Sequence, residues 1–383
     1  MGSLSLREWQ VKAMRLWREA GYRGIVGAVT GGGKTIFALA AIEEYKPRAT
    51  LIVVPTVALL EQWWGEAAAF FKLRLDDINI VNGKTTKVVS GTINIVVLNT
   101  AAKIGKLPDR TLLIVDECHK AATENFSAVL QLPHQASLGL SATPERQYDD
   151  GLSEILVPHL GPVLLNYTYR EAMADGVIVP FNLRNLVFEL EPECQQRYDQ
   201  ITKAIARSVS KLGIEAPESV ALMLKRARVL NMSTQRVKLA LRLIARHSGE
   251  KALIFHENVE ACEVIHHVLK ENGVKAGIYH SKMSSRQRAQ MIADYKSSEM
   301  DVLVTCRALD EGFNVPATQI GIIAASTATR RQRIQRPGRV LRPSSGKDGA
   351  IIYTLVATDP EIRRLKEEED EMEGVAEVTW AKA

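Results

Sequence analysis

Hydrophobic residues in the first part of the chain gather in short runs rich in valine, isoleucine and leucine, separated by longer stretches with helical spacing of apolar positions. Such runs are typical of strands buried on both faces of a parallel sheet, and the stretches between them are typical of covering helices. We therefore predict strands at residues 24–29, 50–54, 94–98, 111–115 and 137–140. We predict helices at residues 34–45, 58–71 and 125–130.

The alternation lapses in residues 192–247, where Ala, Lys, Arg, Leu and Gln dominate and apolar residues recur at helical spacing. This pattern predicts a helical insert or connector. Strand signals resume at residues 252–255, 276–279, 302–305, 320–324 and 351–356. Beyond them, we expect residues 361–373 to form a solvated helix or a frayed end.

These patterns together predict an α/β protein with two mostly parallel sheets and a helical connector. A length of 383 residues suffices for two or three compact units, each with its own core. We expect a first α/β domain at 1–165, a linker and helical insert at 166–247, a second α/β domain at 248–360 and an acidic C-terminal tail at 361–383.

The composition, 46% hydrophobic and 24% charged, excludes wholesale disorder, collagen-like repeats and a disulfide-stapled miniprotein. No apolar run approaches the roughly 20 residues that span a bilayer, and Arg7 and Glu8 lie where a signal peptide would be apolar. We expect a protein that is not secreted and has no membrane partner, located in the cytoplasm, or in the nucleus if eukaryotic. The four cysteines form no C-x-x-C pair, which favours a reducing compartment and argues against a zinc site.

Charge is distributed unevenly along the chain. The whole sequence has 49 basic and 44 acidic residues, but residues 361–383 hold eight acidic and four basic side chains. The remaining residues therefore carry a net charge of +9. A basic body fits a surface that binds a polyanion, although an ordinary solvated surface explains the same charge.

A glycine-rich segment, AVTGGGKT at residues 28–35, follows a predicted buried strand and precedes a predicted helix. Consecutive glycines let backbone N–H groups face an anion, and a helix N-terminus adds favourable partial charge. This pattern predicts a phosphate-binding loop in which Lys34 reaches the terminal phosphates and the Thr35 hydroxyl binds Mg²⁺. The glycines are Gly31, Gly32 and Gly33. The alternative is a plain glycine loop with an incidental Gly-Lys-Thr.

Two acidic residues follow the predicted strand at residues 111–115, namely Asp116 and Glu117. Ligands of open parallel sheets bind beyond the carboxyl ends of the strands. Hydrolysis of a phosphoanhydride needs a carboxylate that holds Mg²⁺, a role that suits Asp116, and a group that orients water, a role that suits Glu117. Read alone, the same pair is equally consistent with a helix cap.

Together with these elements, the chain carries motifs that resemble those of superfamily 2 helicases and translocases of the DExH type. In chain order they are LREWQ (6–10), TGGGKT (30–35), VVPTVALLEQW (53–63), LNTA (98–101), DECH (116–119), SATP (141–144), LIFHENVEAC (253–262), VTCRALDEGFNVP (304–316) and QRPGRVLR (335–342). The run RRQRIQRPGRVLR at 330–342 is most similar to the XPB and UvsW-like branch.

This resemblance implies two RecA-like domains with mostly parallel sheets and ATP in the cleft between them. The first domain would supply Lys34, Thr35, Asp116 and Glu117, and Gln10 would contact the adenine base. From the second domain, Arg339 and Arg342 would act as arginine fingers, in a segment with six arginines within thirteen residues.

The resemblance further implies an ATP-dependent DNA helicase or translocase with 3′ to 5′ polarity. We expect a monomeric motor that binds DNA in preference to RNA and largely without regard to sequence. Nucleic-acid contacts are expected from Thr56, Thr100 and Thr305, and coupling of the ATP site to the strand from His119, Gln335, Ser141 and Thr143. Alternatives are a satisfied semi-buried role for His119 and a capping role for Ser141 and Thr143.

Other features leave two interpretations open. The basic residues of 192–247 either contact nucleic acid or form a solvated helical face. Trp63 and Trp64 either stack on bases or belong to packing. At the level of function, the alternatives are a duplex translocase or branch-remodelling or annealing enzyme without full unwinding, an RNA helicase, and a P-loop ATPase that moves a polypeptide or regulates one.

Overall fold

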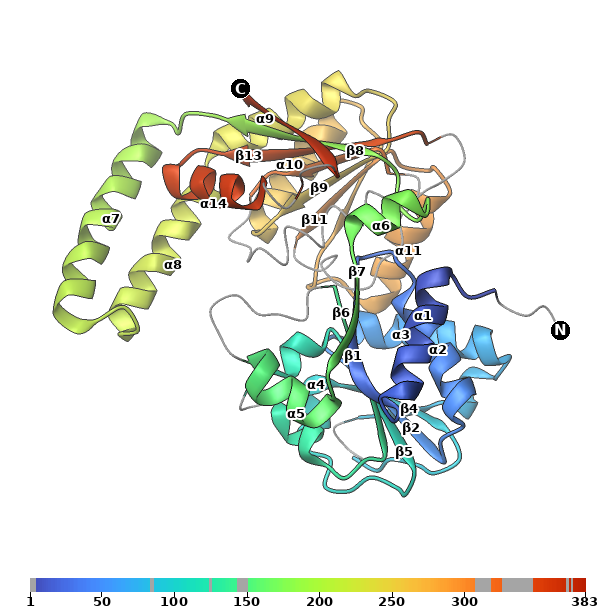
Figure 1. Ribbon diagram of the computed structural model, residues 1–383. Coiled ribbons are helices and arrows are strands. Elements are labelled where there is room, and N and C mark those ends of the chain that lie inside the picture. Colours follow the sequence, from blue (N-terminus) through green and yellow to red (C-terminus); the bar gives the residue numbers. More distant parts are fainter. Residues whose placement is uncertain are drawn as a thin grey trace. The chain divides into compact units, whose positions relative to one another are not determined.

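The computed structural model (Figure 1) describes residues 5–82, 86–123, 126–142, 151–306, 318–325, 347–369, 372 and 375–383. The described residues divide into two compact units, the first ending at Val177 and the second beginning at Ile178. Each unit is built on a sheet of seven strands in which every described pair is parallel.

The first sheet has the strand order β3-β4-β2-β5-β6-β1-β7. Its strands are β1 (Arg23–Ala28), β2 (Ala49–Val54), β3 (Asn79–Val81), β4 (Ile93–Val97), β5 (Thr111–Asp116), β6 (Ala136–Ser141) and β7 (Val163–Tyr167). Its α-helices are α1 (Glu8–Glu19), α2 (Lys34–Tyr45), α3 (Val57–Phe71), α4 (Leu98–Ala101), α5 (Val157–Leu160) and α6 (Tyr169–Ala174). The described residues of this unit also form four single-turn elements: η1 (Leu75–Asp77), η2 (Cys118–Ala121), η3 (Ser127–Gln131) and η4 (Leu152–Leu156).

The second sheet has the strand order β10-β11-β9-β12-β13-β8-β14. Its strands are β8 (Phe181–Val187), β9 (Ala252–His256), β10 (Ala276–Tyr279), β11 (Val302–Cys306), β12 (Ile320–Ile323), β13 (Ala350–Val356) and β14 (Ala376–Lys382). Its helices are α7 (Pro192–Leu212), α8 (Pro217–Asn231), α9 (Thr234–Arg246), α10 (Val259–Glu271), α11 (Ser285–Lys296) and α14 (Asp359–Glu369). Helices α7 and α8 form a hairpin that projects away from this sheet (Figure 1).

The predicted α/β fold with parallel sheets is confirmed, and all ten predicted strands are present within about two residues of their expected bounds. The strands that the sequence did not predict are β3, β7, β8 and β14. Three of these form sheet edges. Edge strands are covered less completely than central ones, so they lack the continuous apolar run that marks a buried parallel strand.

Three expectations need correction. The helix expected at residues 125–130 is a 3₁₀ segment, η3, in its described part. Strand β8 lies in the segment expected to be a linker, yet it pairs with β13 along seven residues. Strand β14 lies in the expected tail, yet it pairs with β8. The helices expected between 192 and 247, and near 361–373, are confirmed as α7, α8, α9 and α14.

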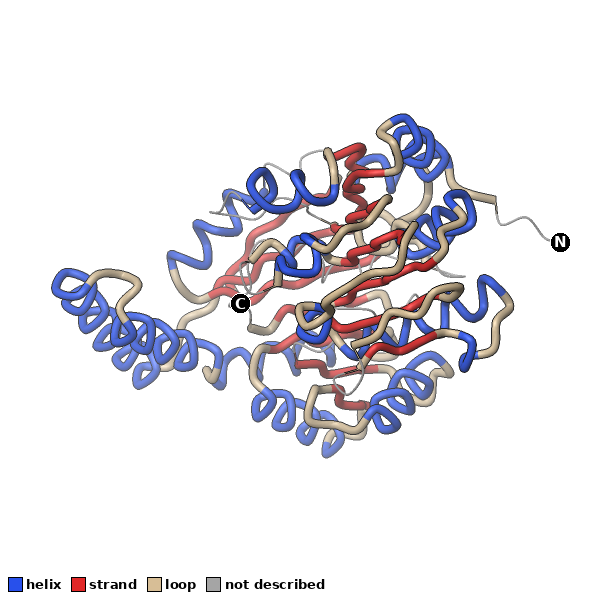
Figure 2. The backbone as a smooth tube through the Cα atoms, turned by 90° about the horizontal axis from the view of Figure 1, so that it is seen from below, coloured by secondary structure: helices blue, strands red, loops and turns tan. Residues whose placement is uncertain are grey.

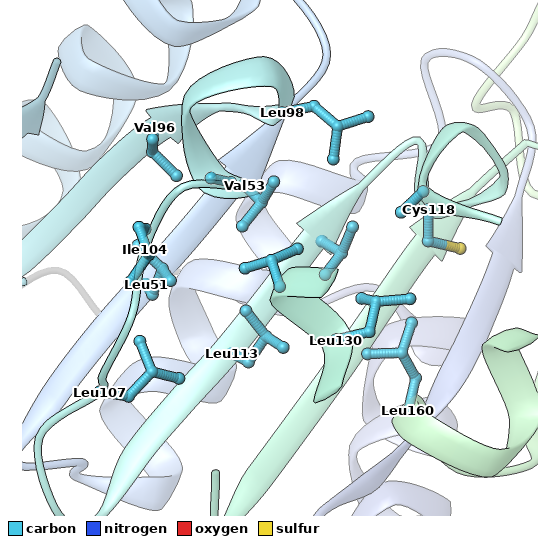
Figure 3. Packing of buried hydrophobic residues seen from close by; sticks show 14 of the residues in the cluster. Leu51, Val53, Val96, Leu98, Ile104, Leu107, Leu113, Cys118, Leu130 and Leu160 are labelled. Atoms are coloured by element: carbon cyan, nitrogen blue, oxygen red, sulfur yellow. The ribbon is translucent and has the colours of Figure 1, made fainter. Parts of the chain in front are cut away.

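Each unit has its own hydrophobic core. In the first, apolar side chains of β2, β4 and β5 pack beneath the short elements that follow β4 and β5, with Leu51, Val53 and Leu113 fully buried (Figure 3). The second core joins β9, β11 and β12 to α9 and α10 through residues such as Ile254, Leu243 and Ile265. In both units the strands lie between helices (Figure 2), which explains why the central strands are almost wholly apolar.

A buried arginine ties the end of the helical connector to the second sheet. The guanidinium of Arg236 on α9 donates to the carbonyl oxygens of Ala324 (2.9 Å) and Leu355 (2.7 Å) and pairs with the Glu361 carboxylate at 2.6 Å. This ion pair holds the pKa of Glu361 below its ordinary value against the opposing effect of burial. Because a buried charge without a partner is strongly destabilising, α9 and α14 are integral parts of this unit.

Within the part of the chain that the structure describes, no helix combines the length and the apolar character needed to cross a bilayer.

Candidate functional site

The glycine-rich loop joins the carboxyl end of β1 to the amino end of α2. Gly31 and Gly33 have φ angles of 90° and 102°, which disfavour residues with a side chain, and the Gly32 N–H donates to the Val29 carbonyl oxygen at 3.0 Å. Gly33 caps the first turn of α2, a helix of 12 residues. The loop therefore presents its backbone at a helix N-terminus, the arrangement expected of a phosphate site.

Lys34 and Thr35 occupy the first turn of α2, and both side chains are half-buried. The ammonium of Lys34 donates to the carbonyl oxygen of Ala28 at 2.7 Å, so it lies over the loop. Its charge also partly offsets the rise in the pKa of Asp116 that burial and Glu117 cause, so the lysine and this carboxylate interact electrostatically. Two of the residues that the sequence predicted to act together are therefore brought together.

Helix α1 fixes the loop from the side opposite to its N–H groups. The indole Nε1–H of Trp9 donates to the Gly32 carbonyl oxygen at 3.2 Å, and the Gln10 side-chain amide donates to the Gly33 carbonyl oxygen at 2.9 Å. A Cβ atom at Gly33 would lie 2.9 Å from the Gln10 amide nitrogen. Two glycine carbonyls are thus held by one helix, which leaves little freedom for the loop.

Gln10, predicted to contact adenine, is 2% exposed. Its side-chain oxygen Oε1 accepts from the Arg7 backbone N–H at 2.8 Å. The base contact stays a prediction, since the observed role of Gln10 is to connect α1 to the loop. Sequence analysis missed Trp9 as a contributor. Trp9 also stacks on Tyr167 with ring centroids 5.0 Å apart. The spacing Trp-Gln before a glycine loop was the available signal.

Asp116 is the last residue of β5. Strand β6 lies between β5 and β1, the strand that leads into the loop. Oδ1 of Asp116 accepts from the Glu117 backbone N–H at 2.9 Å, and its Oδ2 accepts from the indole Nε1–H of Trp63 at 2.8 Å. Burial, and next the charge of Glu117, raise the pKa of Asp116 to about 6, while Trp63 and Lys34 oppose this rise. The carboxylate is therefore placed where additional positive charge would stabilise it.

Glu117 is 8% exposed and has a left-handed backbone conformation, with φ 48° and ψ 49°. This conformation is uncommon for a residue with a side chain and costs about 1–2 kcal/mol. Such strain concentrates at functional positions, where the surrounding structure enforces it. The turn separates Glu117 from the strand that carries Asp116.

His119 and Ser141 meet at the ends of neighbouring strands. Their side chains are hydrogen-bonded, with His119 Nδ1 and Ser141 Oγ 3.0 Å apart. The same nitrogen lies 3.4 Å from Glu117 Oε2. His119 is 2% exposed and Ser141 is fully buried. Through His119, these contacts connect Glu117 to the end of β6, and the coupling role of His119 and Ser141 stays a prediction.

The residues present fit a magnesium nucleotide. The loop glycines carry no side chains that would obstruct their backbone N–H groups, and Lys34 supplies a cation beside the loop. Carboxylate and hydroxyl oxygens, of the kind that Asp116 and Thr35 carry, are the ligands that Mg²⁺ prefers. Among the described residues, no cluster of three or more His, Cys, Asp and Glu forms a separate metal site.

Comparison with known families agrees with this geometry. The family described as "Type III restriction enzyme, res subunit" matches residues 3–146, and "Helicase conserved C-terminal domain" matches residues 235–344. Among the described residues, the first match lies within the first seven-stranded unit and the second match within the second unit. This chain is a superfamily 2 helicase.

Relatives of this helicase lie in the XPB branch. "DNA 3'-5' translocase XPB2" of Sulfurisphaera tokodaii is 28% identical over 95% of this chain and 85% of its own length. "DNA 3'-5' helicase XPB" of Kineococcus radiotolerans is 25% identical over 93% of this chain and 60% of its own length. The chain thus spans most of the archaeal relative but well under two thirds of the bacterial one.

A solved structure shows the same fold. "S. cerevisiae Dbp5 bound to RNA and ADP BeF3" superposes with a TM-score of 0.65, at 14% identity, over 98% of this chain and 89% of that one. At this identity the likeness establishes the fold of two RecA-like domains.

The helicase residues predicted to contact nucleic acid have varied surroundings. Thr56 caps α3, with its hydroxyl oxygen accepting from the Leu59 backbone N–H at 3.3 Å. Thr100 is half-buried in the short helix α4. Thr305, at the end of β11, is 1% exposed, and its hydroxyl has no hydrogen-bond partner among the described residues. None of these positions excludes or proves a backbone contact, so the three assignments stay predictions.

Four predicted helicase residues lie outside the described residues: Thr143, Gln335, Arg339 and Arg342. Their roles as coupling residues and arginine fingers stay predictions. The same holds for the expectation that one nucleotide contacts both RecA-like domains.

Proposed function

We propose that this helicase uses ATP hydrolysis to translocate 3′ to 5′ along DNA. One observation carries the proposal. The glycine loop, Lys34, Asp116 and Glu117 lie beyond the carboxyl ends of strands in the first sheet, where His119 is hydrogen-bonded to Ser141. The names of the archaeal and bacterial relatives, a translocase and a helicase, supply the substrate and the polarity.

In this proposal the loop and the start of α2 bind the phosphates of ATP. Backbone N–H groups and the helix N-terminus receive negative charge, and the Lys34 ammonium approaches the terminal phosphates. Asp116 and Thr35 would hold Mg²⁺, which neutralises phosphate charge as it develops. The bonds from Trp9 and Gln10 keep the loop in one conformation, so little order is lost on binding.

Glu117 would orient the attacking water and accept its proton. Its backbone adopts a strained left-handed turn that the surrounding structure enforces, and its carboxylate lies beside the His119 ring. A movement of the Glu117 carboxylate on hydrolysis would therefore alter its contact with His119. Through the hydrogen bond, it would also alter the position of Ser141. This route connects the reaction to the segment that follows β6.

DNA binding in this proposal is largely independent of sequence, because hydroxyl and amide contacts to the backbone do not read base edges. The motor would work as a monomer, with all parts of the engine on one chain. Translocation is the proposed activity, and strand separation is a separate outcome that the experiment below measures.

Steady-state ATP hydrolysis tests the proposal, measured with single-stranded DNA, duplex DNA, RNA and no polymer. DNA should raise turnover at least about tenfold, and RNA should raise it less. Displacement of streptavidin from biotinylated single strands reports polarity, and release should be faster from the 5′ end, toward which a 3′ to 5′ motor moves. Tailed duplexes report whether strands separate. The matched control is Lys34→Ala, which should hydrolyse no ATP.

Turnover that none of these polymers changes would end the motor proposal. Stimulation by a protein in place of DNA would favour the alternative of a polypeptide-moving ATPase. Stimulation by duplex DNA without strand separation on any tailed substrate would assign the chain to the duplex-translocating or branch-remodelling class.

A further inference from the structure

Trp63 makes a contact that neither packing nor base stacking requires. It lies on α3, is 1% exposed and donates its indole N–H to the Asp116 carboxylate at 2.8 Å. A buried tryptophan N–H needs an acceptor, and a neutral backbone carbonyl is sufficient. Three other tryptophans of the first unit, Trp9, Trp17 and Trp64, do donate to backbone carbonyl oxygens. Only Trp63, among these four, donates to an ionisable side chain.

The contact leaves the carboxylate with one orientation. One oxygen of Asp116 accepts from Trp63 and the other from the Glu117 backbone N–H, so both ends of the carboxylate plane are held. Each carboxylate oxygen has two lone pairs, of which one is now used. Rotation about the side-chain bond would break a buried, charge-assisted hydrogen bond, the stronger class of such bonds.

The position of α3 explains why this contact forms. Helix α3 directly follows β2, and β2 pairs with β5, whose last residue is Asp116. Thr56 caps the helix at its amino end, and Trp63 lies about two turns further along on its buried face. The same cap that begins the helix therefore sets the depth at which the indole meets the end of β5.

We propose that Trp63 is a positioning residue of the ATP site, whose indole N–H orients Asp116 so that its remaining lone pairs face the magnesium nucleotide. This inference rests on the proposed function, because it assigns Asp116 the task of holding Mg²⁺. Trp63 touches neither nucleotide nor metal and acts through Asp116 alone. Loss of the N–H should therefore weaken the contribution of Mg²⁺ to nucleotide binding, and leave the metal-independent contribution unchanged.

The test compares Trp63→Phe with Trp17→Phe. Each variant loses one buried indole N–H, but Trp17 donates to the Ser137 carbonyl oxygen, at the opposite end of β6 from Ser141. The dissociation constant of a fluorescent ADP analogue is measured with Mg²⁺ and with EDTA. The ratio of the dissociation constant in EDTA to that in Mg²⁺ should fall about tenfold in Trp63→Phe, as expected for a lost hydrogen bond to a charged group. It should be unchanged in Trp17→Phe.

A double-mutant cycle with Asp116→Asn separates positioning from general damage. If Trp63 acts through Asp116, adding Trp63→Phe to Asp116→Asn changes the ratio no further. Equal ratios in wild type and Trp63→Phe, or additive effects in the cycle, would overturn the proposal. Melting temperatures of the two tryptophan variants check that both lose comparable stability.

A spectroscopic readout on the wild-type chain keeps the test valid if Trp63→Phe does not fold. With ¹⁵N-labelled indoles, the Trp63 resonance is assigned by elimination using variants of the other four tryptophans. Adding Mg²⁺ to the ADP-bound protein should shift this resonance, and Asp116→Asn should abolish the shift. No shift would overturn the proposal. Wild-type protein that shows the shift but no DNA-stimulated hydrolysis would instead contradict the proposed function and leave the role of Trp63 in place.

Discussion

Asp116 and Glu117 are adjacent in sequence, yet the structure gives them different surroundings. Two hydrogen bonds fix the Asp116 carboxylate, and burial raises its pKa to about 6. Glu117 turns away from the strand in a left-handed conformation and approaches His119. The backbone turn between them gives the two carboxylates different surroundings, and the predicted division of labour, one residue for the metal and one for water, stays a prediction.

Glu117→Gln should lower ATP turnover at least about 100-fold, because the amide keeps the shape of the side chain but cannot accept the proton of the attacking water. Affinity for ATP should change less than about threefold, since the loop and Lys34 are intact. Phosphate release and equilibrium binding of ATP measure the two quantities. The control is the exposed Glu43→Gln. Turnover close to that of wild type would remove Glu117 from its assigned role.

The His119–Ser141 hydrogen bond is expected to connect hydrolysis with DNA. His119→Ala and Ser141→Ala should each reduce the DNA stimulation of turnover several-fold, and the double variant should reduce it no further, because both residues act in one contact. The readout is the ratio of turnover with and without DNA. Ser137→Ala is the matched control, since its hydroxyl donates to the Leu160 carbonyl oxygen at the other end of the same strand. Equal losses in all three single variants would point to destabilisation of β6.

At the scale of elements, the interior strands other than β8 were predictable, whereas three of the four edge strands in the described sheets were not. Strands such as β2 and β5 are buried at every residue, so their sequences are continuous apolar runs. Strand β14 has an alternating, partly exposed pattern, and β7 is mostly exposed or half-buried. A short, mixed sequence becomes a strand only because a neighbour offers its hydrogen-bonding edge, which is information that lies elsewhere in the chain.

The basic residues of the connector either contact nucleic acid or form a solvated face, and the α7–α8 hairpin is where an experiment can distinguish these two interpretations. Lys203, Arg207 and Lys211 are exposed on α7 and recur every four residues, so they share one face. Within the hairpin, Arg226 packs over the Tyr198 ring at 5.6 Å, and Ser208 and Ser219 are hydrogen-bonded at 2.8 Å. The hairpin is thus held as a unit that can carry this basic face.

If the face contacts DNA, changing all three residues to Glu should weaken DNA binding at least about tenfold at low salt. The slope of the logarithm of the binding constant against the logarithm of the salt concentration should become shallower by about one for each lost phosphate contact. Fluorescence anisotropy over a series of salt concentrations measures both. Lys270→Glu, Lys275→Glu and Lys296→Glu combined make the same change in net charge on other exposed positions. An unchanged salt slope would identify the face as merely solvated.

At the scale of the whole molecule, two separately cored units lie on one chain, and the second is closed by parts of the chain far apart in sequence. The Arg236–Glu361 pair joins the end of the connector to the helix after β13. The chain passes from β7 of the first sheet to β8 of the second, so among the described residues the two units divide between Val177 and Ile178. Family membership, by contrast, was evident from the order of motifs.

Mixing experiments test whether a single chain contains the whole engine. Lys34→Ala and Arg339→Ala should each reduce DNA-stimulated hydrolysis at least about 100-fold, because one removes the proposed phosphate-binding cation and the other a predicted arginine finger. In a monomeric motor, an equal mixture of the two variants stays inactive. Recovery of activity in the mixture would show that neighbouring chains share sites. Light scattering of the wild-type protein provides the control for oligomeric state.

The sequence by itself determined the central strands, the phosphate loop, the acidic pair after β5 and the helicase family. Each of these is encoded by neighbouring residues or by the order of short motifs. Tertiary structure alone decided which distant residues hold the phosphate site and the second sheet in place. Trp63 and Asp116 are 53 positions apart, and Arg236 and Glu361 are 125 positions apart. Such contacts depend on how strands and helices pack, and burial forces each polar group to find its partner wherever the fold places one.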